Sequence, residues 1–403
     1  MTTKNFFKKT MATSVLALMC AATSFAQVVQ DVAINEINFP DTNFRNSILA
    51  INNNATVLTA NKIKSTYSID VSNKYIADLK GIEFFTALTS LKCNNNQLTS
   101  LDLSKLTGLE QLFCSNNQLR SINVQGLINM KYFNCDHNQL SSLNVSDMTS
   151  VMGLNCSFNK LSLLDVSKLR SLKSLECQQN QLFVLDVALL IYLESLICHD
   201  NELSALDLSG AANITNLDCS FNQLSALDIS DLINLEVLTC NNNQIAALDV
   251  SNSPKITKFW CMNNKLSSLD VSALTKLSIS EFSNQTPTLT LTNRGSDYRV
   301  AISLNNPTEL RSGITYDGTN LISNNKEIKT SSFKVNVPGS GVKMTGSFTF
   351  NYEESTSIPK INAANRQIVG YYSIIGAQLP EEPQNGIYII LYDNGTAEKV
   401  MKK

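Results

Sequence analysis

The sequence predicts a repeat solenoid of the α/β repeat class, mostly β in practice, with a parallel sheet along its concave face and small antiparallel β modules after it. Three observations predict this fold: cysteines recur at one constant spacing, an asparagine follows each cysteine at a fixed distance, and an aliphatic residue follows that asparagine at a fixed distance. The nine cysteines are Cys93, Cys114, Cys135, Cys156, Cys177, Cys198, Cys219, Cys240 and Cys261. Uninterrupted copies of so short a unit indicate stacked turns that share one core.

Each turn follows the consensus Leu-x-x-Leu-x-Cys-x-x-Asn-x-Leu-x-x-Leu-Asp-Val-Ser-x-Leu-x-x, which is the leucine-rich-repeat pattern. The alternation around Leu91, Lys92 and Cys93 predicts a short strand with the leucine and cysteine inward and the lysine outward. The asparagine stands where the strand ends and the chain turns. Its side chain is expected to pair with backbone groups that would cost about 1–3 kcal/mol each if buried without a partner.

The second half of the turn carries an acidic phrase, as in Asp165-Val166-Ser167. A turn this short has no room for a helix on its outer side, so a short extended piece and a tight turn are expected there. Asn123 and Asn144 replace the aspartate in two turns. These two turns are expected to be locally softer, without a break in the solenoid.

Residues 1–26 have the features of a secretory signal peptide. Lysines precede an apolar run over residues 11–22, and Ser24-Phe25-Ala26 forms a small-x-small cleavage site, so the mature chain is expected to begin at Gln27. Cys20 follows a methionine where a lipid-anchored cysteine needs a small residue, so no lipid anchor is predicted. No other apolar run approaches the roughly 18 residues that a membrane span requires.

Residues 27–87 are expected to cap the solenoid and to include a degenerate repeat. One helix is predicted from Asp41 through Leu49, and a second from near Thr59 with Ile63 on its inner side. The loop at residues 52–56 lacks the carboxylates of a calcium loop, so no calcium is expected.

The chain after the repeats changes its period. Phe282 takes the cysteine position and Gln285 the asparagine position of a partial last turn, after which residues alternate and turn signals recur. The predicted organisation is a signal peptide at 1–26, a cap at 27–87, repeats at 88–285, a β-sandwich-like module at 286–354 docked on the last repeat, a linker at 355–367 and a β domain at 368–403.

The repeats resemble a known group of proteins. A cysteine in every turn, the Asp-Val-Ser phrase and the opening Ile37-Asn38-Phe39-Pro40-Asp41 resemble the cysteine-ladder branch of the bacterial internalin-like leucine-rich-repeat proteins. The resemblance covers about residues 30–285. It implies the fold and a surface that binds a host or surface partner, without specifying which partner.

The tail resembles the C-terminal sorting domain of the type IX (Por) secretion pathway of Bacteroidota. The matching sequences are Tyr372-Ser373-Ile374-Ile375-Gly376, Gly386-Ile387-Tyr388-Ile389-Ile390 and Lys399-Val400-Met401-Lys402. Ser373 stands where that family has aspartate. The resemblance implies transport across the inner membrane of a Gram-negative bacterium to the exterior or the outer-membrane surface. The alternative is a final β module without an export function.

Composition and charge exclude several functions. The net charge is −2 and 16% of residues are charged, with no basic stripe, so no nucleic-acid partner is expected. His137 and His199 are the only two histidines, about 14 Å apart at ~4.8 Å per rung. That separation is too large for one metal ion or one catalytic triad. The buried cysteines are expected to be free and unreactive. No catalytic residue, metal or cofactor is predicted.

The outward side chains of the strands are the candidate binding surface. Large apolar residues interrupt an otherwise polar, mildly acidic face near its front and near its end, as protein recognition favours. Trp260 and Met262 have an alternative role as contacts to the following β module. The candidate residues are Phe113, Tyr132, Asp136, Ile197, His199, Asp218, Val237, Trp260 and Met262.

The predicted function is non-enzymatic binding at the cell surface, with a protein or glycan ligand recognised by a monomer through its concave face. A structural surface-layer or matrix component without a discrete ligand is the alternative. A discrete partner favours the first function, and self-assembly into ordered arrays favours the second.

Overall fold

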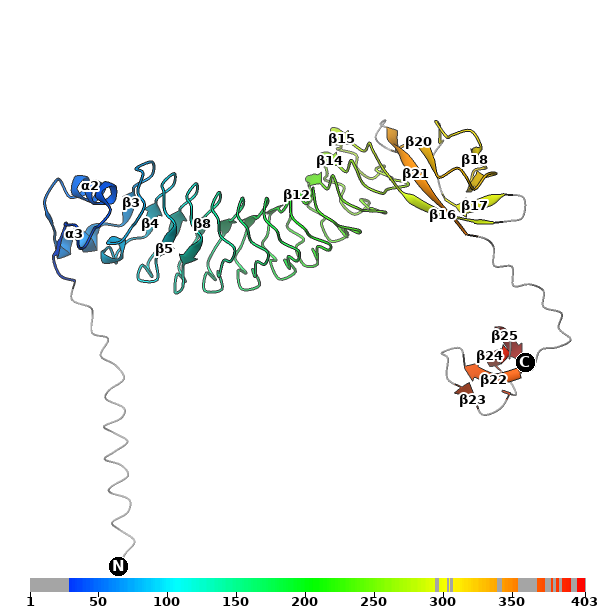
Figure 1. Cartoon of the computed structure of the whole chain (residues 1–403), viewed down its shortest axis with the longest axis horizontal. Helices are drawn as coiled ribbons and strands as arrows, with labels where there is room; N and C mark the ends of the chain where they lie inside the picture. Colours follow the sequence, from blue (N-terminus) through cyan, green and yellow to red (C-terminus); the bar gives the residue numbers. More distant parts are fainter. Residues whose placement is uncertain are drawn as a thin grey trace, which may run out of the picture.

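The structure is a computed structural model that describes residues 29–293, 297–302, 304, 307–338, 343–353, 368–373, 378–379, 382–383, 386–392 and 397–402. The predicted signal peptide at 1–26, with Cys20, and the predicted linker at 355–367 lie outside the described residues. Figure 1 shows the cap, the stacked turns and the β module in chain order. The predicted fold class, a mostly-β leucine-rich-repeat solenoid, is confirmed.

The N-terminal cap contains both predicted helices. Helix α2 (Thr42–Ile51) begins after Asp41, whose Oδ1 accepts from the Phe44 N–H at 2.9 Å. Helix α3 (Ala60–Ser65) begins after Thr59, and strands β1 (Val32–Ala33) and β2 (Val57–Leu58) pair beside them. The other carboxylate oxygen of Asp41 accepts from the Ala77 N–H at 2.8 Å, which ties the cap to the first turn.

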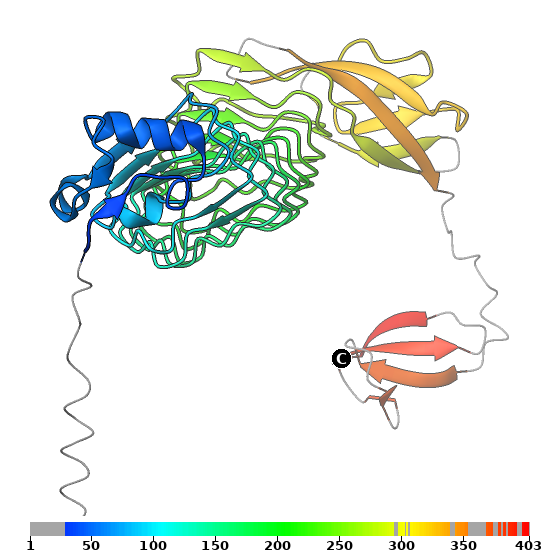
Figure 2. The same ribbon diagram turned by 60° about the vertical axis from the view of Figure 1, so that its left-hand side comes forward.

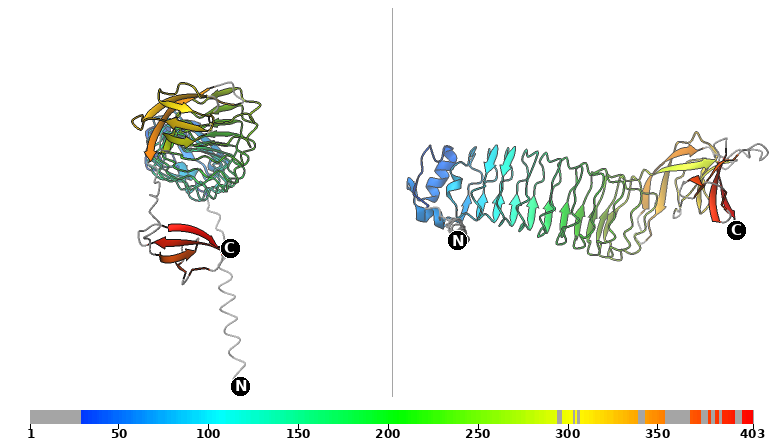
Figure 3. Two further views of the ribbon diagram at one scale, coloured as in Figure 1. Left: turned by 90° about the vertical axis from the view of Figure 1, so that its right-hand side faces the viewer. Right: turned by 90° about the horizontal axis from the view of Figure 1, so that it is seen from below.

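A parallel sheet of eleven strands forms one face of the solenoid (Figure 3). Neighbouring strands pair in parallel with the same register, so each inward residue stacks on its counterpart in the next turn. The strands are β3 (Ser68–Asp70), β4 (Ser90–Lys92), β6 (Gln111–Phe113), β8 (Tyr132–Asn134), β9 (Gly153–Asn155), β10 (Ser174–Glu176), β11 (Ser195–Ile197), β12 (Asn216–Asp218), β13 (Val237–Thr239), β14 (Lys258–Trp260) and β15 (Ile279–Glu281).

The core runs the length of the stack as columns of equivalent positions. The central strand residue and the following cysteine are buried in the repeat turns, as at Leu175 and Cys177. Each buried leucine contributes roughly 1.5–3 kcal/mol. Since every turn packs only on its neighbours, stability belongs to the array and not to one turn.

The asparagine ladder joins each turn to the one before it. In Asn117, Oδ1 accepts from the Leu98 N–H at 3.1 Å, while Nδ2 donates to the carbonyls of Cys93 at 3.0 Å and Cys114 at 3.1 Å. Gln285 repeats the arrangement at the last turn, with Oε1 accepting from the Leu266 N–H at 3.0 Å. The predicted roles of the asparagine and of Gln285 are therefore confirmed.

The outer side of each turn is thin, as predicted. Between residues 88 and 285 it carries only short strands such as β5 (Ser100–Asp102) and β7 (Ser121–Asn123), with tight turns between them; a single 3-10 turn, η1 (Ile82–Phe84), precedes this span. The aspartate caps the tight turn: Asp165 Oδ1 accepts from the Ser167 N–H at 2.9 Å. Asn144 Oδ1 accepts the same bond from the Ser146 N–H at 3.1 Å, so the substitution does not break the turn.

The module after the repeats is one mixed sheet. Its six strands are ordered β18-β19-β17-β16-β21-β20, and β16 pairs with β21 in parallel. The predicted sandwich is corrected to this single sheet, because the long strand β21 pairs on both of its sides and so joins segments that alternation alone assigned to two layers. The strands are β16 (Thr288–Asn293), β17 (Tyr298–Ala301), β18 (Ile314–Tyr316), β19 (Asn320–Ser323), β20 (Thr330–Asn336) and β21 (Lys343–Glu353).

Backbone bonds hold this module on the last turn (Figure 2). The Gln285 N–H donates to the Thr345 carbonyl at 2.8 Å, and the Ser347 N–H donates to the Gln285 carbonyl at 2.8 Å. A Cβ on Gly346 would lie 1.8 Å from the Gln285 carbonyl oxygen, so only glycine fits this close approach. The Val271 N–H also donates to the Pro338 carbonyl at 3.1 Å.

The described tail residues form a separate four-stranded antiparallel sheet. Its strands are β22 (Ile368–Ser373), β23 (Gln378–Leu379), β24 (Gly386–Tyr392) and β25 (Ala397–Lys402), in the order β23-β22-β24-β25. Two of the three matched tail sequences lie within β24 and β25, whereas residues 374–376 of the first are outside the described part. The sorting role therefore stays a prediction.

Leu175→Asp is expected to unfold several neighbouring turns. Leu175 is fully buried, and the substitution places a charge without a partner among apolar side chains. Circular dichroism should show a large loss of cooperativity and of melting temperature. Lys168→Asp, at an exposed position on the outer side of the preceding repeat, is the control and should change little. An unchanged melting curve for Leu175→Asp would contradict its buried position.

The outer aspartates predict a loss of stability in acid. Hydrogen bonds from the serine that follows in the same tight turn lower the pKa of Asp165, Asp228 and their equivalents. A carboxyl whose pKa is lowered in the folded state stabilises the fold above the unfolded value near 3.9, and that contribution is lost as pH falls through the folded value. The melting temperature should therefore drop between about pH 5 and pH 2.

A variant with asparagine at the serine-capped positions of the repeats is the control for this acid effect. Its turns should stay closed, as Asn144 already shows, while its melting temperature should depend less on pH. Identical pH profiles for the two proteins would assign the acid sensitivity to other carboxyls. The positions are Asp102, Asp165, Asp207, Asp228, Asp249 and Asp270.

Candidate functional site

The predicted surface residues all belong to the outward positions of the concave sheet or to the position just after each cysteine. Phe113, Ile197, Asp218 and Trp260 end their strands, Tyr132 and Val237 begin theirs, and Asp136, His199 and Met262 follow the cysteines. They are spread over many turns, so they do not form one compact site. Of these residues, Phe113 and Tyr132 both line one pocket.

That pocket is a notch of about 340 Å³ on the concave face. It exists because Gly153 has no side chain between Tyr132 and Ser174, its register partners on the neighbouring strands. A Cβ on Gly153 would lie 3.2 Å from Cδ1 of Tyr132, so the tyrosine ring leans over the glycine. The notch, which we call the Gly153 notch, is lined by Phe113, Tyr132, Phe133, Asn134, Met152, Gly153, Leu154, Asn155, Lys173, Ser174 and Glu176.

The polar side of the Gly153 notch carries a fixed carboxylate. Asn155 Nδ2 donates to Glu176 Oε2 at 3.0 Å, across neighbouring strands. Lys173 lies on the same wall, but its Nζ pairs with Glu194 Oε1 at 2.9 Å. Lys131 pairs with Glu110 at 2.7 Å in the same manner. The lysines along this edge are thus neutralised by their neighbours.

The front of the notch is aromatic. Lys92 Nζ lies 5.8 Å from the centre of the Phe113 ring, within cation–π distance. Tyr132 is 44% exposed and offers a ring face to solvent. The sequence singled out these two aromatic residues and placed Glu176 among the acidic residues of the face, but it did not point to Gly153, Met152 or Asn155. The detectable signal was Gly153, the one glycine among the outward positions of strands β4 to β15.

A second group of side chains forms the rim where the strands end. His137 Nδ1 lies 2.8 Å from Asp136 Oδ2, and its ring stacks on Phe158 with centroids 4.1 Å apart. Phe158 and Phe221 have φ angles of 52° and 51° in the left-handed region, where a bulky residue is strained. They are 40% and 52% exposed, respectively.

The two histidines lie in separate pairs. His199 Nδ1 lies 2.6 Å from Asp200 Oδ2, whereas His137 is paired with Asp136. Over the described residues, no group of three histidine, cysteine or acidic side chains is placed to hold a metal ion. Neither pair has a nucleophile in contact with it among the interactions of the described residues.

The cysteine thiols are buried and held in their neutral form. All nine ladder cysteines are free. Burial raises the pKa of the Cys93 thiol to about 12, and it raises the pKa of Cys156 to about 12 as well. Because the thiolate is the reactive form, these side chains are core residues and not nucleophiles.

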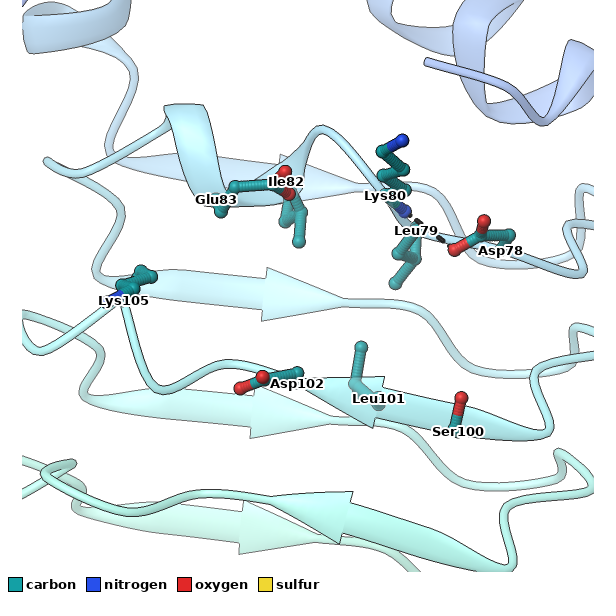
Figure 4. A pocket seen from close by; sticks show the side chains of 9 residues that line it. All are labelled: Asp78, Leu79, Lys80, Ile82, Glu83, Ser100, Leu101, Asp102 and Lys105. Atoms are coloured by element: carbon teal, nitrogen blue, oxygen red, sulfur yellow. Dashed lines mark hydrogen bonds between the residues drawn. The ribbon is translucent and has the colours of Figure 1, made fainter. Parts of the chain in front are cut away.

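A further pocket of about 380 Å³ lies beside the cap, between η1 and β5 (Figure 4). Its carboxylates are occupied by local backbone bonds. Asp78 Oδ1 accepts from the Lys80 N–H at 2.8 Å, and Glu83 Oε2 accepts from the Gly81 N–H at 2.7 Å. Asp102 caps its own turn through the Ser104 N–H at 3.0 Å. These contacts explain the acidic side chains as parts of turns.

Comparisons with known proteins agree with this architecture. The family model described as leucine-rich repeats (2 copies) matches residues 86–126. A segment of 71 residues is 41% identical to internalin J of Listeria monocytogenes serotype 4b (strain F2365). It amounts to 17% of this chain and 8% of that protein. The fold is an internalin-like leucine-rich-repeat solenoid with a cysteine ladder.

Two solved structures of internalins are similar to this chain to different degrees. The functional domain of InlJ from Listeria monocytogenes, which includes a cysteine ladder, superimposes with a TM-score of 0.54 at 23% identity, over 81% of this chain and 100% of that one. The internalin inlF from the strain F2365 gives a TM-score of 0.38 at 20% identity, over 65% of this chain and 100% of that one. The first likeness shows the fold alone, and the second is too low to carry an argument.

None of the helices in the described part of this internalin-like chain is long and apolar enough to cross a membrane.

The thiols give a direct test of the ladder. Mature protein unfolded with an alkylating agent should take up nine labels, whereas the folded protein should react slowly, because its thiols are buried and neutral. Mass spectrometry of intact protein and of peptides reads the labels. Four disulfides in the non-reduced protein would overturn the ladder of free cysteines.

Proposed function

We propose that this chain is a non-enzymatic surface protein that binds another protein through its concave sheet and serves in adhesion or recognition. The observation that carries the proposal is the Gly153 notch, where two aromatic residues and a fixed carboxylate share one pocket on a rigid face. Aromatic side chains that are centrally placed and become desolvated dominate binding energy at protein interfaces.

The sheet is suited to this role because its shape is fixed before a partner arrives. Each inner strand is bonded on both sides, and the asparagine ladder fixes the loop that follows it. A rigid surface loses little conformational entropy on binding. The signal-peptide sequence at 1–26 and the tail resembling a sorting domain support export to the cell surface.

Replacing both Phe113 and Tyr132 with serine should weaken binding to a protein partner by at least about 2 kcal/mol, the value typical of a hot spot. The partner is to be found by screening the mature chain against arrays of purified extracellular proteins and of glycans. The melting temperature should change little, because both side chains lie on the outward face of the sheet.

Alanine in place of Lys105 or Lys168, on the outer side of the turns, is the matched control and should leave the affinity unchanged. Equal losses from concave and outer substitutions would indicate a general effect on stability. Full affinity without Phe113 and Tyr132, together with a large loss when residues 286–354 are altered, would move the function to the β module. Self-assembly into ordered arrays without a partner would favour a structural surface layer.

A further inference from the structure

We propose that the Gly153 notch receives a cationic side chain of the protein partner, with arginine as its preferred occupant. This inference rests on the proposed function of the concave sheet and specifies the chemistry of the partner at one place on it. Three features carry it: an aromatic platform, a carboxylate without a cation, and the pairing of the neighbouring lysines Lys131 and Lys173 with other glutamates.

The platform is the ring of Tyr132. It leans over Gly153, with Cδ1 and Cε1 at 3.2 and 3.7 Å from the position that a Cβ would take there. One edge of the ring therefore lies over Gly153, and Tyr132 remains 44% exposed to solvent. A guanidinium group is flat and stacks on such a face, in addition to the electrostatic attraction between a cation and the ring.

The carboxylate is that of Glu176, two rungs from Tyr132 and so roughly 9.6 Å along the stack. Asn155 holds one of its oxygens at 3.0 Å, which fixes its direction across the notch. Within the described part of the chain, no lysine, arginine or histidine nitrogen pairs with Glu176. The neighbouring Lys173 is paired with Glu194 at 2.9 Å instead.

The charge around the notch favours a cation over a neutral ligand. The concave lysines of the central turns, Lys131 and Lys173, are each neutralised by a glutamate. Glu176 and Asp218 project from the same row of the sheet, two turns apart, and neither is in a salt bridge with another described residue. The Glu176 carboxylate, which has no cation beside it, attracts a group of the opposite sign and disfavours groups of like charge. A neutral glycan would gain nothing from this field.

Arginine fits the notch better than lysine for geometric reasons. Its planar fork pairs with a carboxylate through two parallel hydrogen bonds, whereas an ammonium group is a point charge. The same plane can rest on the Tyr132 ring while its edge meets Glu176. Asn134, which also lines the notch, offers its side-chain amide to the backbone that carries the arginine.

The test uses the mature full-length chain labelled with ¹³C at its methionine methyl groups. Met152 lines the Gly153 notch, and Met262 lies on the same face far along the stack, so it serves as the internal reference. Met152→Leu assigns the reporting signal. The probe is the peptide acetyl-Gly-Arg-Gly-amide, and its partner probe carries citrulline, which has the same shape without the charge.

The arginine peptide should shift the Met152 signal saturably and leave the Met262 signal unchanged. The citrulline peptide should bind at least about tenfold more weakly, because hydrogen bonds that involve charged groups are about twice as strong as those between neutral groups. Glu176→Gln should weaken arginine binding by a similar factor. Glu202→Gln, which makes the same change at an exposed position that does not line the notch, should leave it nearly unchanged.

Several outcomes would overturn the inference. Equal binding of both peptides, or equal losses from Glu176→Gln and Glu202→Gln, would show general attraction without a site. Saturable binding of an N-acetylglucosamine trimer that is unaffected by Glu176→Gln would identify a glycan site. Failure of the arginine peptide, combined with a partner whose binding still requires Phe113 and Tyr132, would sink this inference and leave the proposed function standing.

Discussion

The structure depends on satisfying backbone polar groups at the place where each strand ends. Each short turn must reverse direction there inside a packed stack, which would leave amide and carbonyl groups buried without partners. One asparagine solves this, since its amide reaches two carbonyls and its oxygen accepts from the preceding turn. Because these bonds cross between turns, the same residue that closes one loop also fixes the register of the next.

This constraint explains the chemistry of the neighbouring positions. The residue before each asparagine adopts a left-handed backbone, which asparagine tolerates and most other residues resist. Phe158 and Phe221 occupy that conformation, and Phe158 stacks on His137. The cysteine is small enough to sit at the narrow edge of the core, and burial there keeps its thiol neutral.

The concave face follows from the same regularity. Fixed register places the outward side chains in straight rows. A side chain of unusual size in one row therefore changes the shape of the surface at that point. Gly153 is such a case: it removes one side chain, lets Tyr132 lean across and leaves Glu176 exposed to the resulting space. Elsewhere in the rows, neighbouring charges pair with each other, as Lys173 does with Glu194. The proposed binding site on this scaffold therefore lies where an outward position departs from the usual side chains of the repeat.

The sequence by itself determined the solenoid, its inward and outward positions, the two cap helices and the turn-closing role of the asparagines. Each of these depends on local period, on capping residues or on contacts that recur once in every turn, so a single chain reports them directly. Even Gln285 could be assigned in advance, because it stands in the asparagine position.

Only the tertiary structure decided how strands outside the repeats pair and how side chains of neighbouring turns are directed. The order of strands around β21 is set by pairing between residues far apart in the chain, for which alternation carries no signal, so the predicted sandwich became one sheet. To predict the notch, one would need the direction of the Tyr132 ring and the ion pair between Lys173 and Glu194. Side-chain directions across neighbouring turns depend on packing in three dimensions, and the one-dimensional pattern contains positions but not those directions.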